Sequence, residues 1–195
     1  LDEKNQKKLF KYLKNIKKYD LVIVSDFGHG FLNNDVAKKI CKLSHFSSSN
    51  FQLNSTNKVG HNLNKYMNTK NLVINESEMR YEMRNQTEKV EKLMVDLKRR
   101  LKIEHLIVTR GTQGAILLNK RKFFYTEAFA FKTIDKVGAG DTFFSLVSFL
   151  LAGKKNLDLS LFLSSLAAAY NVENIGNSKS FNKITLYKIL SHMLK

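Results

Sequence analysis

Residues 135–153, DKVGAGDTFFSLVSFLLAG, place small residues and two carboxylates directly before an uncharged, largely apolar stretch. Gly138, Ala139 and Gly140 allow backbone amide groups to approach a ligand closely. The first amides of a helix have no partner within it, so a buried helix that begins here offers a site for a phosphoryl group. Asp141 at the same place could take a proton from an attacking hydroxyl group. A tight turn in which Asp141 merely caps the helix is the open alternative.

Strand and helix patterns alternate along the rest of the chain. Continuous apolar runs predict buried parallel strands at 21–25, 71–74 and 105–109, and an amphipathic pattern predicts a helix over 87–101. This alternation predicts a single α/β domain over residues 1–195, doubly wound, with a mainly parallel sheet and helices on both faces. Further strands are expected at 50–53, 115–119 and 122–126, and further helices at 4–18, 33–45, 141–152, 157–174 and 183–194.

Composition limits the function classes to consider. The 195 residues, 43% of them hydrophobic, suffice for one packed domain, and no apolar run is long enough to span a membrane. Cys41 is the single cysteine, which suits a reducing, cytoplasmic compartment. The net charge of +16 would suit nucleic acid, but the lysines are spread along the chain without interleaved aromatic residues. We therefore expect neither a nucleic-acid nor a membrane partner, and keep a basic nucleic-acid-binding protein as a minor alternative.

The loop DFGHG (26–30) directly follows a predicted strand. In an open α/β sheet, ligands gather at the carboxyl ends of the strands, which makes Asp26 and His29 candidates for contact with a substrate or its phosphates. Asp26 would also suit a helix cap. A lone histidine such as His29 is more often a surface residue than a catalytic one.

The loop NESE (75–78) follows the next long apolar strand. If a helical turn begins there, Asn75 and Glu78 share one face of it. A carboxylate and an amide in that position could hold a hydrated Mg²⁺ near phosphates. Glu78 would equally suit the first helical turn, where the dipole favours a negative charge.

The loop TRGTQG (109–114) follows a third strand. Thr109 and the two glycines, Gly111 and Gly114, suit close contact between backbone and a nucleotide. A common turn between two strands is the alternative for this loop.

Together and in this order, these motifs resemble the PfkB/ribokinase family of carbohydrate kinases. DKVGAGD resembles the family signature D-T-x-G-A-G-D, NESE resembles N-x-x-E, and VTRGTQGAIL (108–117) resembles the T-x-G-x-x-G strand and turn. LAAAYNVENIG (166–176) resembles the late A-A-x-x-V-x-x-x-G helix of the adenine pocket. Within the family, VIVSDFGHG (22–30) and FQLNSTNKVGHNLNKY (51–66) are most similar to the heptose-7-phosphate kinases, which are often linked to a nucleotidyltransferase.

The resemblance implies a ribokinase-like fold and ATP-dependent phosphoryl transfer to a hydroxyl group of a sugar or sugar phosphate. Asp141 would be the base, and the amides of Gly138, Ala139 and Gly140 would form the anion hole. A homodimer and a nucleotidyltransferase domain or partner are further expectations. The remaining assignments are Mg²⁺ at Asn75 and Glu78, ATP along Thr109, Gly111 and Gly114, adenine near Asn171 and Gly176, K⁺ near Asp135, and substrate or phosphates near Asp26 and His29.

Some features depart from the family pattern. Lys136 and Val137 replace the small or hydroxyl residues usual in the signature, and His29 stands where heptose kinases often carry a lysine. The glycine-rich sugar-binding strands and the lid that begin family members are missing from this sequence. The alternative function is therefore a non-catalytic nucleotide-binding module derived from such a kinase.

Overall fold

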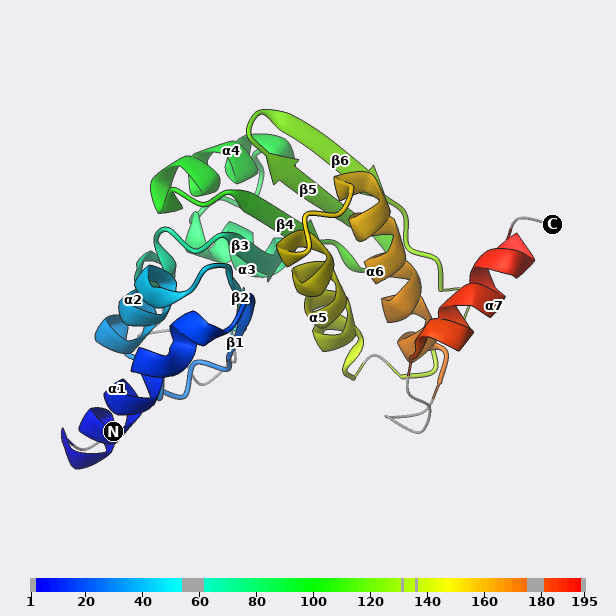
Figure 1. Ribbon diagram of the computed structural model, residues 1–195. Coiled ribbons are helices and arrows are strands. Elements are labelled where there is room, and N and C mark those ends of the chain that lie inside the picture. The colour runs from blue at the N-terminus through cyan, green and yellow to red at the C-terminus, as the bar shows by residue number, and fades with distance from the viewer. Residues whose placement is uncertain (1–2, 54–61, 131, 136, 175–180, 194–195) are drawn as a thin grey trace. The chain divides into compact units, whose positions relative to one another are not determined.

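The computed structural model describes residues 3–53, 62–130, 132–135, 137–174 and 181–193 (Figure 1). The chain forms two compact units, one made of Leu1–Arg110 with Ile116–Phe123 and the other of Gly111–Ala115 with Phe124–Lys195. The single domain over residues 1–195 stays a prediction. Lys136, Gly176 and residues 54–61 of the quoted motifs lie outside the described residues.

Six strands form one sheet in the order of the sequence, and its first four strands are parallel, which confirms the prediction of a mainly parallel sheet. Because the strands are in register, Asn75 at the end of one strand lies opposite Thr109 at the end of the next. The loops that follow these strands therefore begin at the same edge of the sheet. The strands are β1 (Val22–Asp26), β2 (Ser47–Phe51), β3 (Asn71–Asn75), β4 (His105–Thr109), β5 (Ala115–Asn119) and β6 (Lys122–Thr126).

The first unit carries its helices before and between the parallel strands. α1 (Glu3–Leu13) and the 3₁₀ helix η1 (Lys14–Lys18) precede β1, and α2 (Asn34–Leu43) joins β1 to β2. The 3₁₀ helix η2 (Leu63–Tyr66) precedes β3, and α3 (Glu76–Glu82) and α4 (Val90–Leu101) join β3 to β4. Right-handed crossovers between strands added in consecutive order return to the same face of the sheet, so the connecting helices cover one face.

That face holds the main hydrophobic core. Ile40 of α2, Met79 of α3 and Leu97 of α4 are buried there. Alternate residues of a strand point to the same face of a sheet, and alternate apolar residues of the strands complete the core. These strand residues are Val24, Phe51, Leu72, Ile74, Leu106, Val108, Ile116 and Leu118.

The second unit is built around two helices that pack side by side, α5 (Ala139–Ala152) and α6 (Leu157–Val172) (Figure 1). Buried serines lie on both, and the Ser148 and Ser164 hydroxyl groups donate to the carbonyl oxygens four residues earlier, at 2.6 and 2.7 Å. Small side chains whose polar atoms are satisfied within their own helix allow close packing. The 3₁₀ turn η3 (Gly111–Gln113) and α7 (Lys183–Met193) complete this unit. In the part of the chain described here, no helix has the length and apolarity needed to cross a membrane.

Candidate active site

The first turn of α5 presents backbone amides of the kind that the predicted anion hole requires. Gly138 is the N-cap and has a left-handed backbone with φ of 80°, a conformation that a side chain would strain. No side chain caps the helix, and among the described residues the amides of Ala139, Gly140 and Asp141 have no hydrogen-bond partner. These amides lie at the positive end of the helix dipole. Because Asp141 stands inside the first turn with an exposed side chain, it is not the N-cap.

The turn before α5 is tied to the end of α6. The amides of Ile134 and Asp135 both donate to the carbonyl oxygen of Val172, at 2.9 and 3.0 Å. The buried Asn171 side chain donates to the carbonyl oxygen of Val137 at 3.2 Å, and the Val137 amide donates to Asp135 Oδ1 at 2.9 Å. The structure therefore brings Asp135 and Asn171 together with the signature turn, and gives Asn171 a structural role beside its predicted adenine contact.

In the first unit, Asn75 and Glu78 form a capping box at the start of α3. Asn75 Oδ1 accepts from the Glu78 amide at 2.9 Å and from the Ser77 hydroxyl group at 2.7 Å. The amides of Asn75 and Leu53 donate to the two Glu78 carboxylate oxygens, at 3.1 and 3.0 Å. Burial raises the pKa of Glu78, and the two backbone hydrogen bonds oppose that rise. The predicted pair does lie in one helical turn, where it stabilises the start of the helix.

The same two side chains limit how a metal ion could be held. Among the described residues, no group of three or more His, Cys, Asp or Glu side chains could hold a metal ion. Asn75 Oδ1 already accepts two hydrogen bonds, whereas each Glu78 carboxylate oxygen accepts only one. A carboxylate oxygen has a second lone pair, so Glu78 can still accept from water. These residues fit Mg²⁺ that keeps its water shell and contacts the protein through those waters.

Replacing Glu78 by Gln tests both roles. We expect the free energy of unfolding to fall by about 1 kcal/mol, because the amide keeps one acceptor oxygen where the carboxylate had two. We also expect turnover to require a higher Mg²⁺ concentration. Urea unfolding and a Mg²⁺ titration of the full-length protein measure the two effects. Ser77→Ala is the control, since it alters the same turn and leaves the carboxylate in place; an unchanged Mg²⁺ titration in Glu78→Gln rules out the metal role.

Two glycines of the TRGTQG loop have a left-handed backbone conformation. Their surroundings differ, so the need for glycine has a different explanation at each position. Gly111 has φ of 58° with open space where a Cβ would lie. Gly114 has φ of 79°, and a Cβ there would lie 1.9 Å from the carbonyl oxygen of Thr126. Close packing therefore explains Gly114 without a ligand. Contact of Thr109, Gly111 and Gly114 with a nucleotide stays a prediction.

Asp26 lies in a buried network that sequence reasoning did not find. Its side chain is 4% exposed; Lys65 Nζ and the Tyr66 hydroxyl group both lie 2.5 Å from Oδ2, and the Gly28 amide donates to Oδ1 at 2.9 Å. Lys65 also donates to the carbonyl oxygen of Leu32 at 3.0 Å, so a single lysine contacts the first residue of the DFGHG loop and the chain two residues beyond its end. Burial works to raise the pKa of Asp26, but the hydrogen bonds from Lys65, Tyr66 and Gly28 outweigh it and lower that pKa.

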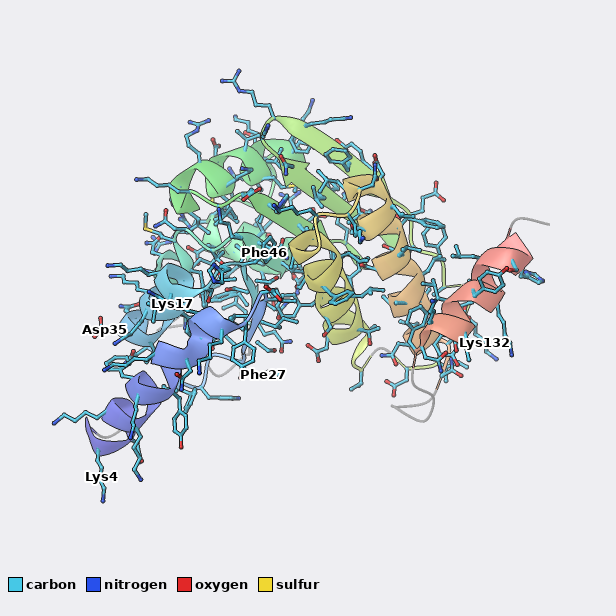
Figure 2. All side chains as sticks on the ribbon, viewed as in Figure 1. Lys4, Lys17, Phe27, Asp35, Phe46 and Lys132 are labelled. Atoms are coloured by element: carbon cyan, nitrogen blue, oxygen red, sulfur yellow. The ribbon has the colours of Figure 1, made fainter. Side chains whose placement is uncertain are left out.

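Phe27, His29 and Gly30 of this loop are exposed to solvent. His29 is exposed, and Phe27, labelled in Figure 2, has 46% of its surface exposed. The N-cap of α2 is Asn33, whose side chain accepts from the Val36 amide at 3.0 Å, so Asp26 does not cap that helix. The sequence held one signal for the network, because Lys65 and Tyr66 belong to the quoted heptose-kinase-like stretch.

Comparison with known sequences gives the family. The sequence pattern of the pfkB family carbohydrate kinases matches residues 1–184. The chain belongs to the pfkB family. This pfkB-family chain is 27% identical over 183 residues to the bifunctional protein HldE of Aliarcobacter butzleri, covering 91% of the chain and 37% of that protein. It is 29% identical over 172 residues to HldE of Campylobacter curvus, covering 86% and 36%. The chain thus spans little more than a third of the length of these curated relatives.

Two solved structures share the fold of this chain. Arabidopsis thaliana ribokinase, complexed with ribose and ATP, matches with a TM-score of 0.77 at 20% identity, over 92% of this chain and 58% of that one. Escherichia coli phosphofructokinase-2, in complex with potassium, matches with a TM-score of 0.78 at 14% identity, over 97% and 63%. The predicted ribokinase-like α/β fold is confirmed.

Proposed function

We propose that the full-length protein transfers the γ-phosphoryl group of ATP to a hydroxyl group of a sugar or sugar phosphate. The observation that carries the proposal is the start of α5, where amides without a partner among the described residues stand beside the Asp141 carboxylate within the family signature. The family match and the likeness to a ribokinase that binds ribose and ATP support it.

In the proposed reaction, Asp141 accepts the proton of the sugar hydroxyl group as its oxygen attacks the γ-phosphorus. A new oxygen–phosphorus bond forms, the bond to the bridging oxygen of ADP breaks, and ADP leaves. The amides of Ala139 and Gly140, with the Gly138 turn that positions them, stabilise the negative charge on the transferring group. When bound, Mg²⁺ would neutralise phosphate charge, with Glu78 holding its waters.

The acceptor we favour is heptose 7-phosphate or a related sugar phosphate. Support comes from the resemblance of residues 22–30 and 51–66 to the heptose-kinase branch and from the bifunctional HldE relatives. A nucleotidyltransferase domain or partner, a homodimer and K⁺ near Asp135 belong to the same proposal, as does the cytoplasmic location suggested by the single cysteine. Contact of Asp26 and His29 with the substrate also belongs to it.

The alternative is a non-catalytic nucleotide-binding module. The side chain of Val137 favours it, because this residue is 75% exposed at a place where the family carries a small or hydroxyl residue. Measurement of ADP release by the full-length protein against sugars and sugar phosphates, heptose 7-phosphate included, separates the two functions. Acceptor-dependent turnover supports the kinase, whereas saturable Mg·ATP binding without turnover on any acceptor supports the module.

Replacing Gly140 by Ala is expected to separate stability from activity. Gly140 lies in the first turn of α5, where no atom lies within 4 Å of a Cβ built on it. An alanine there should raise the free energy of unfolding by about 0.5–1 kcal/mol, because it restricts the unfolded chain. It should lower turnover, because the methyl group enters the space beside the first-turn amides. Urea unfolding and steady-state kinetics measure both; full turnover in a stabilised variant would mean that no ligand approaches Gly140.

A further inference from the structure

Two arginines of the first unit share the carboxylate of Glu76, the first residue of α3. Arg80 donates to Glu76 Oε1 through Nε and Nη2, both at 2.8 Å. Arg110 donates to Glu76 Oε2 through Nε at 2.7 Å. Burial works to raise the pKa of Glu76, but the hydrogen bonds from Arg110 and Arg80 outweigh it and lower that pKa. The cluster therefore holds one negative and two positive charges at neutral pH.

The two arginines differ in how many guanidinium nitrogens remain without a hydrogen-bond partner among the described residues. Arg80 Nη1 donates to the carbonyl oxygens of Gln86 and Glu88, at 3.1 and 2.9 Å, so every nitrogen of its guanidinium group has a partner. Arg110 uses only Nε, and within the described chain its two terminal nitrogens have no partner. Its side chain is 25% exposed. Arg110 therefore adds a positive charge to the cluster. Its guanidinium group is held at Nε, and its two terminal nitrogens can still donate hydrogen bonds.

Arg110 lies where a ligand of this fold would approach. It follows Thr109, the last residue of β4, and Thr109 lies opposite Asn75, the N-cap of α3. Ligands of open α/β sheets bind at this carboxyl edge. The planar guanidinium group binds phosphate oxygens through two parallel hydrogen bonds. Fixing the side chain in advance reduces the conformational entropy lost on binding.

We propose that Arg110 binds a phosphoryl group through its two terminal nitrogens, with Glu76 holding the guanidinium group in position. This inference rests on the proposed kinase function, which places phosphate groups at this edge of the sheet. The phosphoryl group belongs either to the phosphate chain of ATP or to the phosphate of a phosphorylated sugar. Both present the same tetrahedral oxyanion to the arginine.

Replacing Arg110 by Gln in the full-length protein tests the inference by calorimetric titration with two ligand pairs. The first pair is Mg·ATP and adenosine, and the second is heptose 7-phosphate and the unphosphorylated heptose. We expect the dissociation constant of the phosphorylated member of one pair to rise roughly 10- to 100-fold, the value of one or two charged hydrogen bonds. The unphosphorylated member should bind as in the wild type. The affected pair identifies the source of the phosphoryl group.

Arg80→Gln is the matched control, because Arg80 bonds the same carboxylate and each nitrogen of its guanidinium group already has a partner. It should lower thermal stability and leave the ratio of dissociation constants within each pair unchanged. Arg110→Lys, which keeps the charge, should give a smaller rise than Arg110→Gln and remains informative if the Gln variant fails to fold. Unchanged ratios in both Arg110 variants, or equal changes in the Arg80 and Arg110 variants, would overturn the proposal.

Failure of this inference can be told apart from failure of the kinase proposal. A wild-type protein that binds Mg·ATP and transfers no phosphoryl group contradicts the kinase, while the binding ratios still test Arg110. A kinase that turns over with unaltered ratios in the Arg110 variants contradicts the inference alone.

Discussion

Asp141→Asn should lower kcat of the full-length protein by roughly 10²- to 10⁴-fold, the usual contribution of a positioned general base. The amide cannot accept the proton of the attacking hydroxyl group, whereas the backbone amides of the first turn of α5 are unchanged. The dissociation constant for ATP should therefore stay close to the wild-type value. Steady-state kinetics and calorimetric titration with Mg·ATP measure the two quantities.

The matched control is Asp158→Asn. Asp158 is the acidic residue in the first turn of α6, as Asp141 is in the first turn of α5, and both side chains are exposed. Loss of a first-turn carboxylate costs each helix a similar favourable interaction with its dipole. Turnover should fall only in Asp141→Asn. Equal turnover in the two variants would remove Asp141 from the mechanism.

Lys65→Met is expected to lower the free energy of unfolding by about 3–5 kcal/mol, because it leaves a buried carboxylate without its cation. Asp26 is 4% exposed and Lys65 11% exposed, so water cannot replace the lost partner easily. The segment that follows the DFGHG loop also loses the bond from Lys65 to the carbonyl oxygen of Leu32. Urea unfolding of wild type and variant measures the loss.

Two further variants separate the buried pair from a general effect of lysine removal. Lys70→Met breaks an exposed pair with Glu104, whose side chains are 49% and 51% exposed, and should cost less than about 1 kcal/mol. Asp26→Asn combined with Lys65→Met removes both charges and should recover part of the stability lost in Lys65→Met. A double variant less stable than Lys65→Met would show that the ion pair is not the source of the effect.

The pH dependence of stability has a defined sign. The pKa of Asp26 in the folded chain lies below its ordinary value of 3.8. The stabilisation from its ionised form is complete above that value and is lost as the pH falls through the lower, folded pKa. Lys65→Met should weaken this dependence in acid unfolding.

Apolar runs in the sequence predicted most strands of the sheet. The exception is β2, and its burial has a physical cause. β2 begins at Ser47, and its consecutive serines at 47–49 carry no hydrophobic signal. They are nevertheless buried, because hydroxyl and amide side chains satisfy them. Thr69 Oγ1 donates to the carbonyl oxygen of Ser47 at 3.0 Å, and Asn71 Nδ2 donates to the Ser48 hydroxyl group at 2.7 Å. Such partners come from other strands and loops and cannot be read from local periodicity.

The sequence predicted the part of the candidate site that the backbone forms. Gly138 and the free first turn of α5 follow from small residues before an apolar helix. The roles of Lys65 and Arg110 depend on partners 39 and 34 residues away, Asp26 and Glu76. In a sequence with 33 lysines and arginines, Arg110 does not stand out, and Lys65 does so only as part of the heptose-kinase-like stretch. Only the tertiary structure distinguishes these two cations from solvated surface charges.

The role of Asp141 in phosphoryl transfer can be measured with ATP labelled at the γ-phosphoryl group and heptose 7-phosphate as acceptor, using the full-length protein and its Asp141→Asn variant. We expect a labelled sugar bisphosphate from the wild type, far slower formation by the variant, and equal ATP binding by both. Equal rates of product formation, or label recovered from the wild type only as inorganic phosphate, would contradict the proposed reaction.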